Sequence, residues 1–297
     1  MLESWIFWAL LAASMQSVRT AGQKYLTGHI SALGATLVRY LFGLPFVALY
    51  LGWLVYRGDP FLPELNSTFY VCAVIAGLLQ IGATILLIRL FSLRNFAVGS
   101  NYIRGEILFT ALIGTLVFGE MISVPGWIAI LISFSGLLVI SLGHTGKLSS
   151  LWNRSAAYGL GAGLAFSLTS LLIRKASLSI GINDPMLSAA ITLTFMVTMQ
   201  TMITLPWVVL KDSKELGVIF HHWRPSLFVG ITSIIGSAGW FTAFTLEKAA
   251  YVKTLGQVEF ITTLFIAVLY FKERPTRSEI TGMLLIVSGV ILLLQFA

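Results

Sequence analysis

Residues 105–120 read GEILFTALIGTLVFGE, and residues 258–273 read VEFITTLFIAVLYFKE. The second stretch lies on the first, without a gap, when the chain is shifted by 153 positions. Glu106 then falls on Glu259, and in both copies a second acid ends the apolar run. Self-similarity at a fixed offset indicates an internal duplication, in which each copy places one carboxylate within a long apolar stretch.

The similarity extends over a longer segment. Residues 91–140 match residues 244–293 at twelve of fifty positions. Because Leu, Ile and Val coincide easily in apolar sequence, the polar and small matches carry most of the weight. These matches are Glu106/Glu259, Thr110/Thr263, Glu120/Glu273 and Ser135-Gly136/Ser288-Gly289.

The composition indicates an integral membrane protein. The chain is 57% hydrophobic and only 10% charged, with a mean hydropathy of +0.89, so it has too little polar surface for a water-soluble globule of 297 residues. A helix needs about 20 apolar residues to cross a bilayer. Charges and turn residues divide the chain into ten such segments: 4–25, 33–56, 69–90, 96–118, 124–143, 156–175, 186–210, 226–246, 250–271 and 278–296.

The alternative of a transmembrane β-barrel would show strict polar and apolar alternation. Runs such as 127–140 are apolar all round, and a segment in lipid must satisfy its own backbone hydrogen bonds, which favours helices. The sequence therefore predicts an all-α membrane protein. One cysteine, Cys72, and histidines confined to loops predict no metal, no cofactor and no enzymatic activity. The net charge of +7 is typical of loop lysines and arginines near lipid headgroups and predicts no nucleic-acid partner.

Ten spans and one duplication predict two five-helix halves, residues 1–143 and 156–297, joined by a linker at 144–155. Because five is odd, the second half enters the membrane upside down relative to the first. Such inverted-topology repeats are typical of carriers, whose halves rock about a shared site near the midplane.

The doubled pattern of a midmembrane Glu, a second Glu at the helix end and a Ser-Gly pair in the next span resembles the drug/metabolite transporter superfamily, specifically its ten-helix EamA-type carriers. Many members carry proline directly after the first acid, where this chain has Ile107 and Phe260. The resemblance implies secondary transport of a small metabolite across a cell membrane, most simply a bacterial inner membrane. Export is the usual direction. The resemblance also implies cytoplasmic termini, whereas loop charges favour termini outside.

The two repeated acids are the first candidates for the substrate site. At 1.5 Å per residue, each lies about 13 Å into its span and so near the midplane of the bilayer. An ionised carboxylate costs roughly 3 kcal/mol there, so it must be paired, protonated or facing water. We expect Glu106 to lie near Arg19, Arg39 and Arg104, and Glu259 near Lys253 and Gln257. Such a cavity would carry both signs of charge and suit a zwitterion or a proton-coupled solute.

Uncharged candidates complete the expected site. The indole of Trp240 follows a run of small residues, Gly236 to Gly239, that lets helix backbones approach while the ring projects into the remaining space. The full set of expected substrate contacts is Glu106, Glu259, Arg19, Arg104, Arg39, Gln257, Lys253, Trp240, Tyr102 and Gln80.

Structural roles compete with each assignment. Glu106 and an arginine could form a bridge that locks helices together, Arg39 could extend its guanidinium to the headgroups, and Trp240 could face lipid. Gln80 could make an interhelical hydrogen bond worth about 0.6 kcal/mol.

The leading hypothesis is therefore a secondary carrier for a small polar or amphipathic metabolite, either amino-acid-like or toxic. It works by alternating access, with protons as the expected coupling ion, and is a monomer or homodimer among membrane lipids. One alternative is a flippase for a lipid or lipid-linked carrier. An alternative of another class is a structural or sensory membrane subunit that transports nothing.

Overall fold

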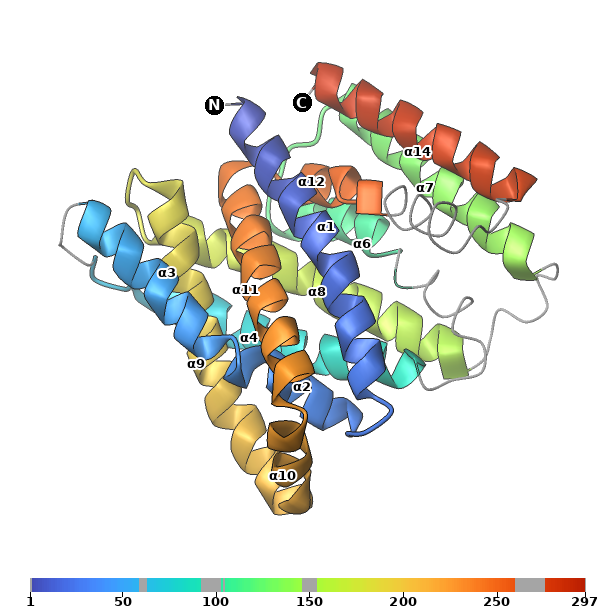
Figure 1. Cartoon of the computed structure of the whole chain (residues 1–297). Coiled ribbons are helices and arrows are strands. Elements are labelled where there is room, and N and C mark those ends of the chain that lie inside the picture. The colour runs from blue at the N-terminus through green and yellow to red at the C-terminus, as the bar shows by residue number, and fades with distance from the viewer. Residues whose placement is uncertain are drawn as a thin grey trace.

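The computed structural model describes residues 2–58, 63–91, 103, 105–145, 154–259 and 276–296. Every regular element within those ranges is a helix, which confirms the all-α class (Figure 1). The helices are α1 (Leu2–Leu26), α2 (Ala32–Leu41), α3 (Leu44–Arg57), α4 (Ser67–Phe91), α6 (Glu106–Val117), α7 (Val124–Thr145), α8 (Arg154–Ser179), α9 (Pro185–Lys211), α10 (Lys214–His221), α11 (Trp223–Leu246), α12 (Ala249–Leu255) and α14 (Arg277–Phe296).

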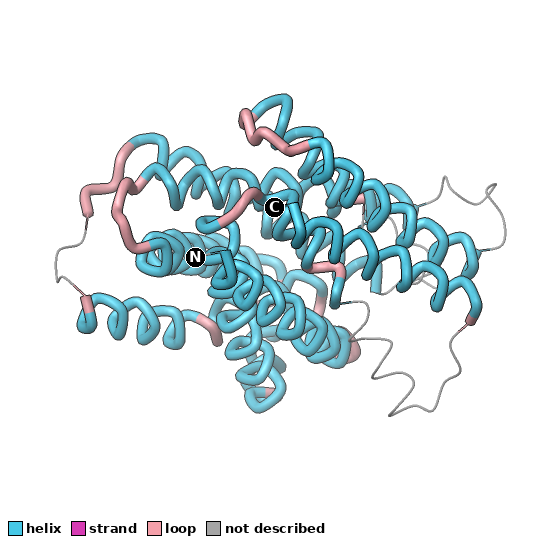
Figure 2. The backbone as a smooth tube through the Cα atoms, turned by 90° about the horizontal axis from the view of Figure 1, so that it is seen from above, coloured by secondary structure: helices cyan, strands magenta, loops and turns pink. Residues whose placement is uncertain are grey.

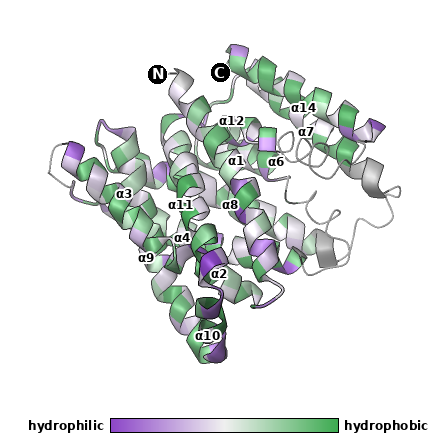
Figure 3. Cartoon of the chain, viewed as in Figure 1, coloured by the Kyte–Doolittle hydropathy of each residue, from purple (hydrophilic) through white to green (hydrophobic). Residues whose placement is uncertain are grey.

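Several of these helices have the dimensions of membrane spans. Those long and apolar enough to cross a bilayer cover 32–57, 67–90, 157–179, 185–211, 223–246 and 277–296. Their outer surfaces carry many exposed large apolar side chains, among them Leu49, Leu284 and Leu210, at 71%, 66% and 87% exposure. Hydrophobic residues are spread along the helices, whereas strongly hydrophilic ones are fewer and are visible, for example, at the lower end of α10 (Figure 3). A water-soluble protein rarely exposes so much apolar area, so the chain is a multi-pass membrane protein.

The second expected span is one crossing built from two helices. α2 ends at Leu41 and α3 begins at Leu44, with Pro45 at the start of α3. Proline has no N–H, and its ring clashes with the carbonyl four residues earlier, so it kinks the span there.

The fourth and ninth expected spans each contain a break within their described residues. In the fourth, α6 begins only at Glu106, which therefore lies in a first helical turn and not in mid-helix. In the ninth, α12 ends at Leu255 and a turn at 256–257 precedes Glu259. Interrupted helices at membrane depth are tolerated where they border a cavity or are buried in protein.

The most extensive helix pairs are α7 with α14, α4 with α8, and α1 with α11 (Figures 1 and 2). Close contacts show that each pair is antiparallel, because residue numbers that rise along one helix fall along its partner. A Cβ on Gly136 would lie 2.5 Å from the Gly282 carbonyl oxygen, and a Cβ on Gly289 would lie 2.7 Å from the Ala129 carbonyl oxygen. Each of these glycines therefore lets α7 and α14 pack backbone to backbone.

The connection between the expected halves is shorter than the linker assigned to it. α7 continues to Thr145 and α8 begins at Arg154, so both ends of the 144–155 segment are helical, and residues 146–153 lie outside the described residues. The first and last helices have their terminal ends on the same side of the molecule, opposite α10 (Figure 1). The division into two inverted five-helix halves stays a prediction.

Candidate functional site

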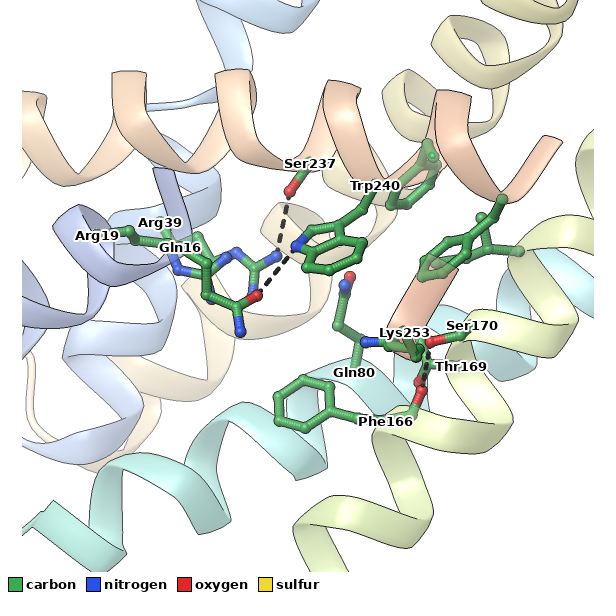
Figure 4. A pocket seen from close by; sticks show the side chains of 13 residues that line it. Gln16, Arg19, Arg39, Gln80, Phe166, Thr169, Ser170, Ser237, Trp240 and Lys253 are labelled. Atoms are coloured by element: carbon green, nitrogen blue, oxygen red, sulfur yellow. Dashed lines mark hydrogen bonds between the residues drawn. The ribbon is translucent and has the colours of Figure 1, made fainter. Parts of the chain in front are cut away.

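A small cavity of about 40 Å³ lies among six helices, α1, α2, α4, α8, α11 and α12 (Figure 4). Its walls consist of Gln16, Arg19, Arg39, Gln80, Phe166, Thr169, Ser170, Ile173, Ser237, Trp240, Phe241, Phe244 and Lys253. One buried water needs about 10–15 Å³, so this space holds roughly three waters. Pockets that bind metabolites measure about 300–1,000 Å³, so the helices must separate before such a molecule enters.

Helical periodicity explains which side chains reach the cavity. On α11 the lining positions are 237, 240, 241 and 244, and on α8 they are 166, 169, 170 and 173, which in both cases is one face of a helix. Gly239 packs α11 closely on α1, because a Cβ there would lie 2.8 Å from the Trp8 carbonyl oxygen. The next residue along α11, Trp240, lines the cavity.

Two arginines form one end of the cavity. The side chains of Arg19 and Arg39 are each only 5% exposed and lie within electrostatic reach of each other. Arg39 donates hydrogen bonds to two hydroxyls, from Nη1 to Thr84 Oγ1 at 3.4 Å and from Nη2 to Ser237 Oγ at 3.2 Å. The Nε of Arg19 has no hydrogen-bond partner in the part of the chain that the structure describes. Because buried guanidinium groups normally have anionic partners, this end is suited to an anionic group.

The other end combines a lysine with aromatic rings. The ammonium Nζ of Lys253 lies 2.5 Å from Glu106 Oε1, and the two side chains are 12% and 15% exposed. The same nitrogen lies 4.7 Å from the ring centroid of Trp240 and 5.4 Å from that of Phe244. The two rings stack with centroids 5.6 Å apart and an interplanar angle of 17°. A cation over aromatic faces is attracted by their negative quadrupoles, so Lys253 occupies a cation site.

Gln16 connects the aromatic rings to the second repeated acid. Its Oε1 accepts a hydrogen bond from Trp240 Nε1 at 3.0 Å, and its Nε2 donates to Glu259 Oε2 at 3.2 Å. The Glu259 carboxylate also attracts the charge of Arg19. With all five groups ionised, three cations (Arg19, Arg39, Lys253) face two carboxylates, which leaves an excess of positive charge around the cavity.

The expected contacts are only partly brought together. Arg19, Arg39, Gln80, Trp240 and Lys253 line the cavity. Glu106 and Glu259 adjoin it through Lys253 and Gln16.

The remaining candidates lie elsewhere. Gln257 does not line the cavity, because its amide donates to the Lys253 carbonyl oxygen one turn earlier. Arg104 and Tyr102 lie outside the described residues.

The pairing of charges differs from the sequence expectation. We expected Glu106 to pair with Arg19, Arg39 or Arg104 of its own half. Among the described residues it pairs with Lys253, and Arg104 lies outside them. The reason is tertiary, since α12 packs against α6 and carries Lys253 to the acid. Arg39 is buried in the cavity wall and does not extend to a headgroup. Gln80 has both expected roles, because it lines the cavity and its Oε1 accepts from Gln200 Nε2 at 2.9 Å.

Gln16 lines the cavity although it was not among the expected contacts. It lies three positions before Arg19, on the same face of α1, and this i, i+3 spacing could have identified it. Phe166 and Ile173 carry no comparable signal, because apolar residues on a membrane helix face lipid, protein or a cavity equally well. Among the described residues, no group of three His, Cys, Asp or Glu side chains is placed to hold a metal ion.

A separate charged cluster lies near the C-terminal end of α11. Arg174 Nε lies 3.2 Å from Glu120 Oε1, and its Nη1 donates to the carbonyl oxygens of Phe244 at 2.5 Å and Glu247 at 2.6 Å. These carbonyls belong to the last turn and cap of a helix, where cations are favoured. Burial raises the pKa of the Glu120 carboxyl, and the charge of Arg174 opposes that rise. The cluster holds α8, α11 and the turn after α6 together.

Comparison with known proteins identifies a matching family and a similar fold. The model of the EamA-like transporter family matches residues 3–142 and again residues 153–295. One solved crystal structure superposes with a TM-score of 0.67, covering 97% of this chain and 94% of its own, at 16% sequence identity. That likeness concerns the fold.

Two curated relatives match nearly the whole chain. Each is named an S-adenosylmethionine uptake transporter. The protein of Rickettsia prowazekii (strain Madrid E) is 23% identical over 301 residues, which cover 97% of this chain and 92% of the relative. The protein of Rickettsia conorii (strain ATCC VR-613 / Malish 7) is 22% identical over 294 residues, covering 95% and 89%.

Proposed function

The chain belongs to the EamA-like transporter family, and from this premise we propose that it is a secondary carrier for a small metabolite that bears a carboxylate. The observation that carries the proposal is the pair of buried guanidinium groups, Arg19 and Arg39, at one end of the cavity. Arg19 has the carboxylate of Glu259 within electrostatic reach, whereas the described hydrogen-bond partners of Arg39 are the hydroxyls of Thr84 and Ser237, which bring no negative charge. A substrate carboxylate would supply that charge in the planar geometry that guanidinium groups bind best.

Alternating access between two inverted halves is the proposed mechanism. By their order in the two copies, α1 corresponds to α8, α4 to α11 and α7 to α14. Exchanging the copies therefore turns the pair α1 with α11 into the pair α8 with α4, and leaves the pair α7 with α14 unchanged. Gly136 and Gly289, at matching positions of the copies, approach Gly282 and Ala129, which also match at an offset of 153. The family model likewise matches twice. These symmetries support halves that move about the cavity between them.

The names of the relatives support a proposed substrate and a proposed direction of transport. S-adenosylmethionine carries an amino-acid carboxylate, which suits the arginine end, so it is our first candidate for the solute. Inward transport, as in the names of the relatives, replaces the outward direction expected from the resemblance. We propose Glu259 as the proton-carrying acid, because the neutral amide of Gln16 is one of its hydrogen-bond partners and keeps that bond when the acid is protonated. A bacterial inner membrane is the proposed location.

The test is counterflow in proteoliposomes loaded with unlabelled S-adenosylmethionine and given the labelled compound outside. We expect accumulation that excess methionine or other carboxylate-bearing analogues reduce, and that adenosine, which has no carboxylate, does not. Arg19→Lys and Arg39→Lys should each raise the apparent KM by about tenfold or more, since a lysine cannot form the bidentate contact.

An exposed arginine provides the matched control. Arg57 stacks on the ring of Trp53 at 4.8 Å at the end of α3, away from the cavity, and Arg57→Lys should leave the KM unchanged. Equal effects of all three substitutions, or counterflow that ignores the carboxylate, would refute the anion site. Absence of counterflow with any labelled metabolite would favour the non-transporting alternative.

A further inference from the structure

We propose that Trp240, Phe244 and Glu106 form a subsite for a cationic group of the transported solute, and that the ammonium of Lys253 occupies this subsite while the carrier is empty. The inference rests on the proposed carrier function and specifies the chemistry of its substrate. The solute would then carry an onium or ammonium group in addition to the carboxylate held by the arginines.

The geometry is that of a cation site. Two stacked rings present their faces to one nitrogen, at 4.7 Å and 5.4 Å, and a carboxylate oxygen lies 2.5 Å from that nitrogen. Quaternary ammonium groups are recognised in proteins by such aromatic faces, and a neighbouring carboxylate adds charge complementarity. The site is defined by α6 and α11, whereas the cation comes from a third helix, α12. Rings and carboxylate would therefore remain together if Lys253 moved away.

The location of Lys253 allows such a movement. It lies in the last turn of α12, a helix of only seven residues that ends in the turn at Gly256. A Cβ on Gly256 would lie 2.5 Å from Trp240 Cη2, so the turn packs directly under the indole. A short helix end makes few backbone hydrogen bonds and opens more readily than a long helix. Lys253 would thus leave the subsite by a movement of this turn, while both rings stay on the long helix α11.

The size of the cavity makes displacement necessary. With Lys253 in place, about 40 Å³ remains, too little for any solute that spans from the arginines to Trp240. A zwitterionic solute would replace Lys253 at Glu106 and bring its own anion to Arg19 and Arg39. Glu106 and the two arginines would then each have a partner of opposite charge from the solute. The cavity would therefore stay small while it is empty and would accept only a solute that carries both charges.

The first experiment measures binding of a bare cation and needs no transport. Purified wild-type protein and the Lys253→Ala variant are titrated with tetramethylammonium in a calorimeter, with tert-butanol as a neutral probe of similar size. Removing the lysine leaves the two rings and Glu106 open, so the variant should bind tetramethylammonium at least about tenfold more tightly than the wild type and show no gain for tert-butanol. Adding Trp240→Leu to the variant should remove the gain.

A matched control and a second measurement complete the test. Lys175 lies 5.7 Å over the ring of Phe118 outside the cavity, and Lys175→Ala should gain no binding. If Lys253→Ala does not fold, Trp240→Leu is tested with the lysine present. Its preference for S-adenosylmethionine over the demethylated analogue with uncharged sulfur should fall about tenfold.

The outcomes separate the two proposals. A folded Lys253→Ala protein that binds tetramethylammonium no better than the wild type would overturn the cation subsite, and so would an unchanged sulfonium preference in Trp240→Leu. Failure of counterflow with intact tetramethylammonium binding would instead overturn the carrier proposal and leave the cation site standing.

Discussion

Glu106 and Glu259 occupy the same position in the two copies of the repeat, but their surroundings differ. Glu106 forms an ion pair with a lysine from the other half, at 2.5 Å. Glu259 accepts a hydrogen bond from the neutral amide of Gln16 and lies within electrostatic reach of Arg19. A duplicated residue thus keeps its position in the sequence repeat while its partner changes. The difference predicts separate roles: Glu106 binds a cationic group, and Glu259 binds and releases a proton.

The largest effect is expected at the ion pair. Glu106→Gln leaves the ammonium of Lys253 largely buried without its carboxylate, and breaking a buried pair from one side costs about 3 kcal/mol or more. We therefore expect a marked fall in the midpoint of thermal unfolding in detergent, together with loss of counterflow. Glu106→Gln/Lys253→Met should recover much of the stability, because neither charge remains. A double-mutant cycle measures the coupling, and additive effects would contradict a direct pair.

Glu259→Gln should affect coupling more than folding. The glutamine can still bond to the Gln16 amide, so the free energy of unfolding should change by only about 1 kcal/mol. We expect accumulation driven by a pH gradient to disappear while counterflow at equal pH continues. The measurement is labelled solute uptake with and without the gradient. If both activities persist, Glu259 carries no proton, and if both are lost, the two acids do not differ in the way proposed.

The interface between α7 and α14 tests the symmetry of the copies. Gly136→Ala and Gly289→Ala each place a Cβ within 2.5–2.7 Å of a backbone oxygen of the facing helix. Both should therefore lower the free energy of unfolding by a similar amount, about 1–3 kcal/mol, which is typical of overpacking. Gly52→Ala is the control, because nothing lies within 4 Å of its added methyl group. A large effect at one glycine alone would argue against equivalent interfaces.

The smallest effect is expected from Ser237→Ala. This change removes one hydrogen bond from Arg39, worth about 1 kcal/mol, and should raise the apparent KM severalfold without changing the maximal rate. Ser288→Ala is the control, since that exposed hydroxyl donates to the Leu285 carbonyl oxygen of its own helix, α14. An increase in KM equal for both would show that Arg39 does not position the solute.

Much of the architecture was predictable because a bilayer restricts the choices. Apolar runs of about 20 residues must be helices, so most helix ranges agree with expectation within a few residues. The kink before Pro45 follows from proline chemistry, although hydropathy alone did not reveal it. The short helix α10 was missed, since eight residues with an apolar face look like a loop between two long spans.

The site was harder to predict than the fold. Costly charges at membrane depth were identifiable from their position, and five of the ten expected contacts, Arg19, Arg39, Gln80, Trp240 and Lys253, do border one cavity. Their pairing was not identifiable, because it depends on which helices touch. Gln16 connects to Glu259 by a hydrogen bond, although the two residues lie 243 positions apart in the chain.

Hydrophobic length and the repeated acids were enough to establish a helical membrane protein with two related copies, because transfer of apolar and charged groups into lipid depends on each segment's own composition. Partner choice arose only on folding. The meeting of α6 with α12 gave Glu106 a lysine, and the packing of α1 on α11 placed Gln16 between Trp240 and Glu259. Ion pairs and hydrogen bonds act over a few ångströms, so they depend on distances that a linear order of residues does not contain.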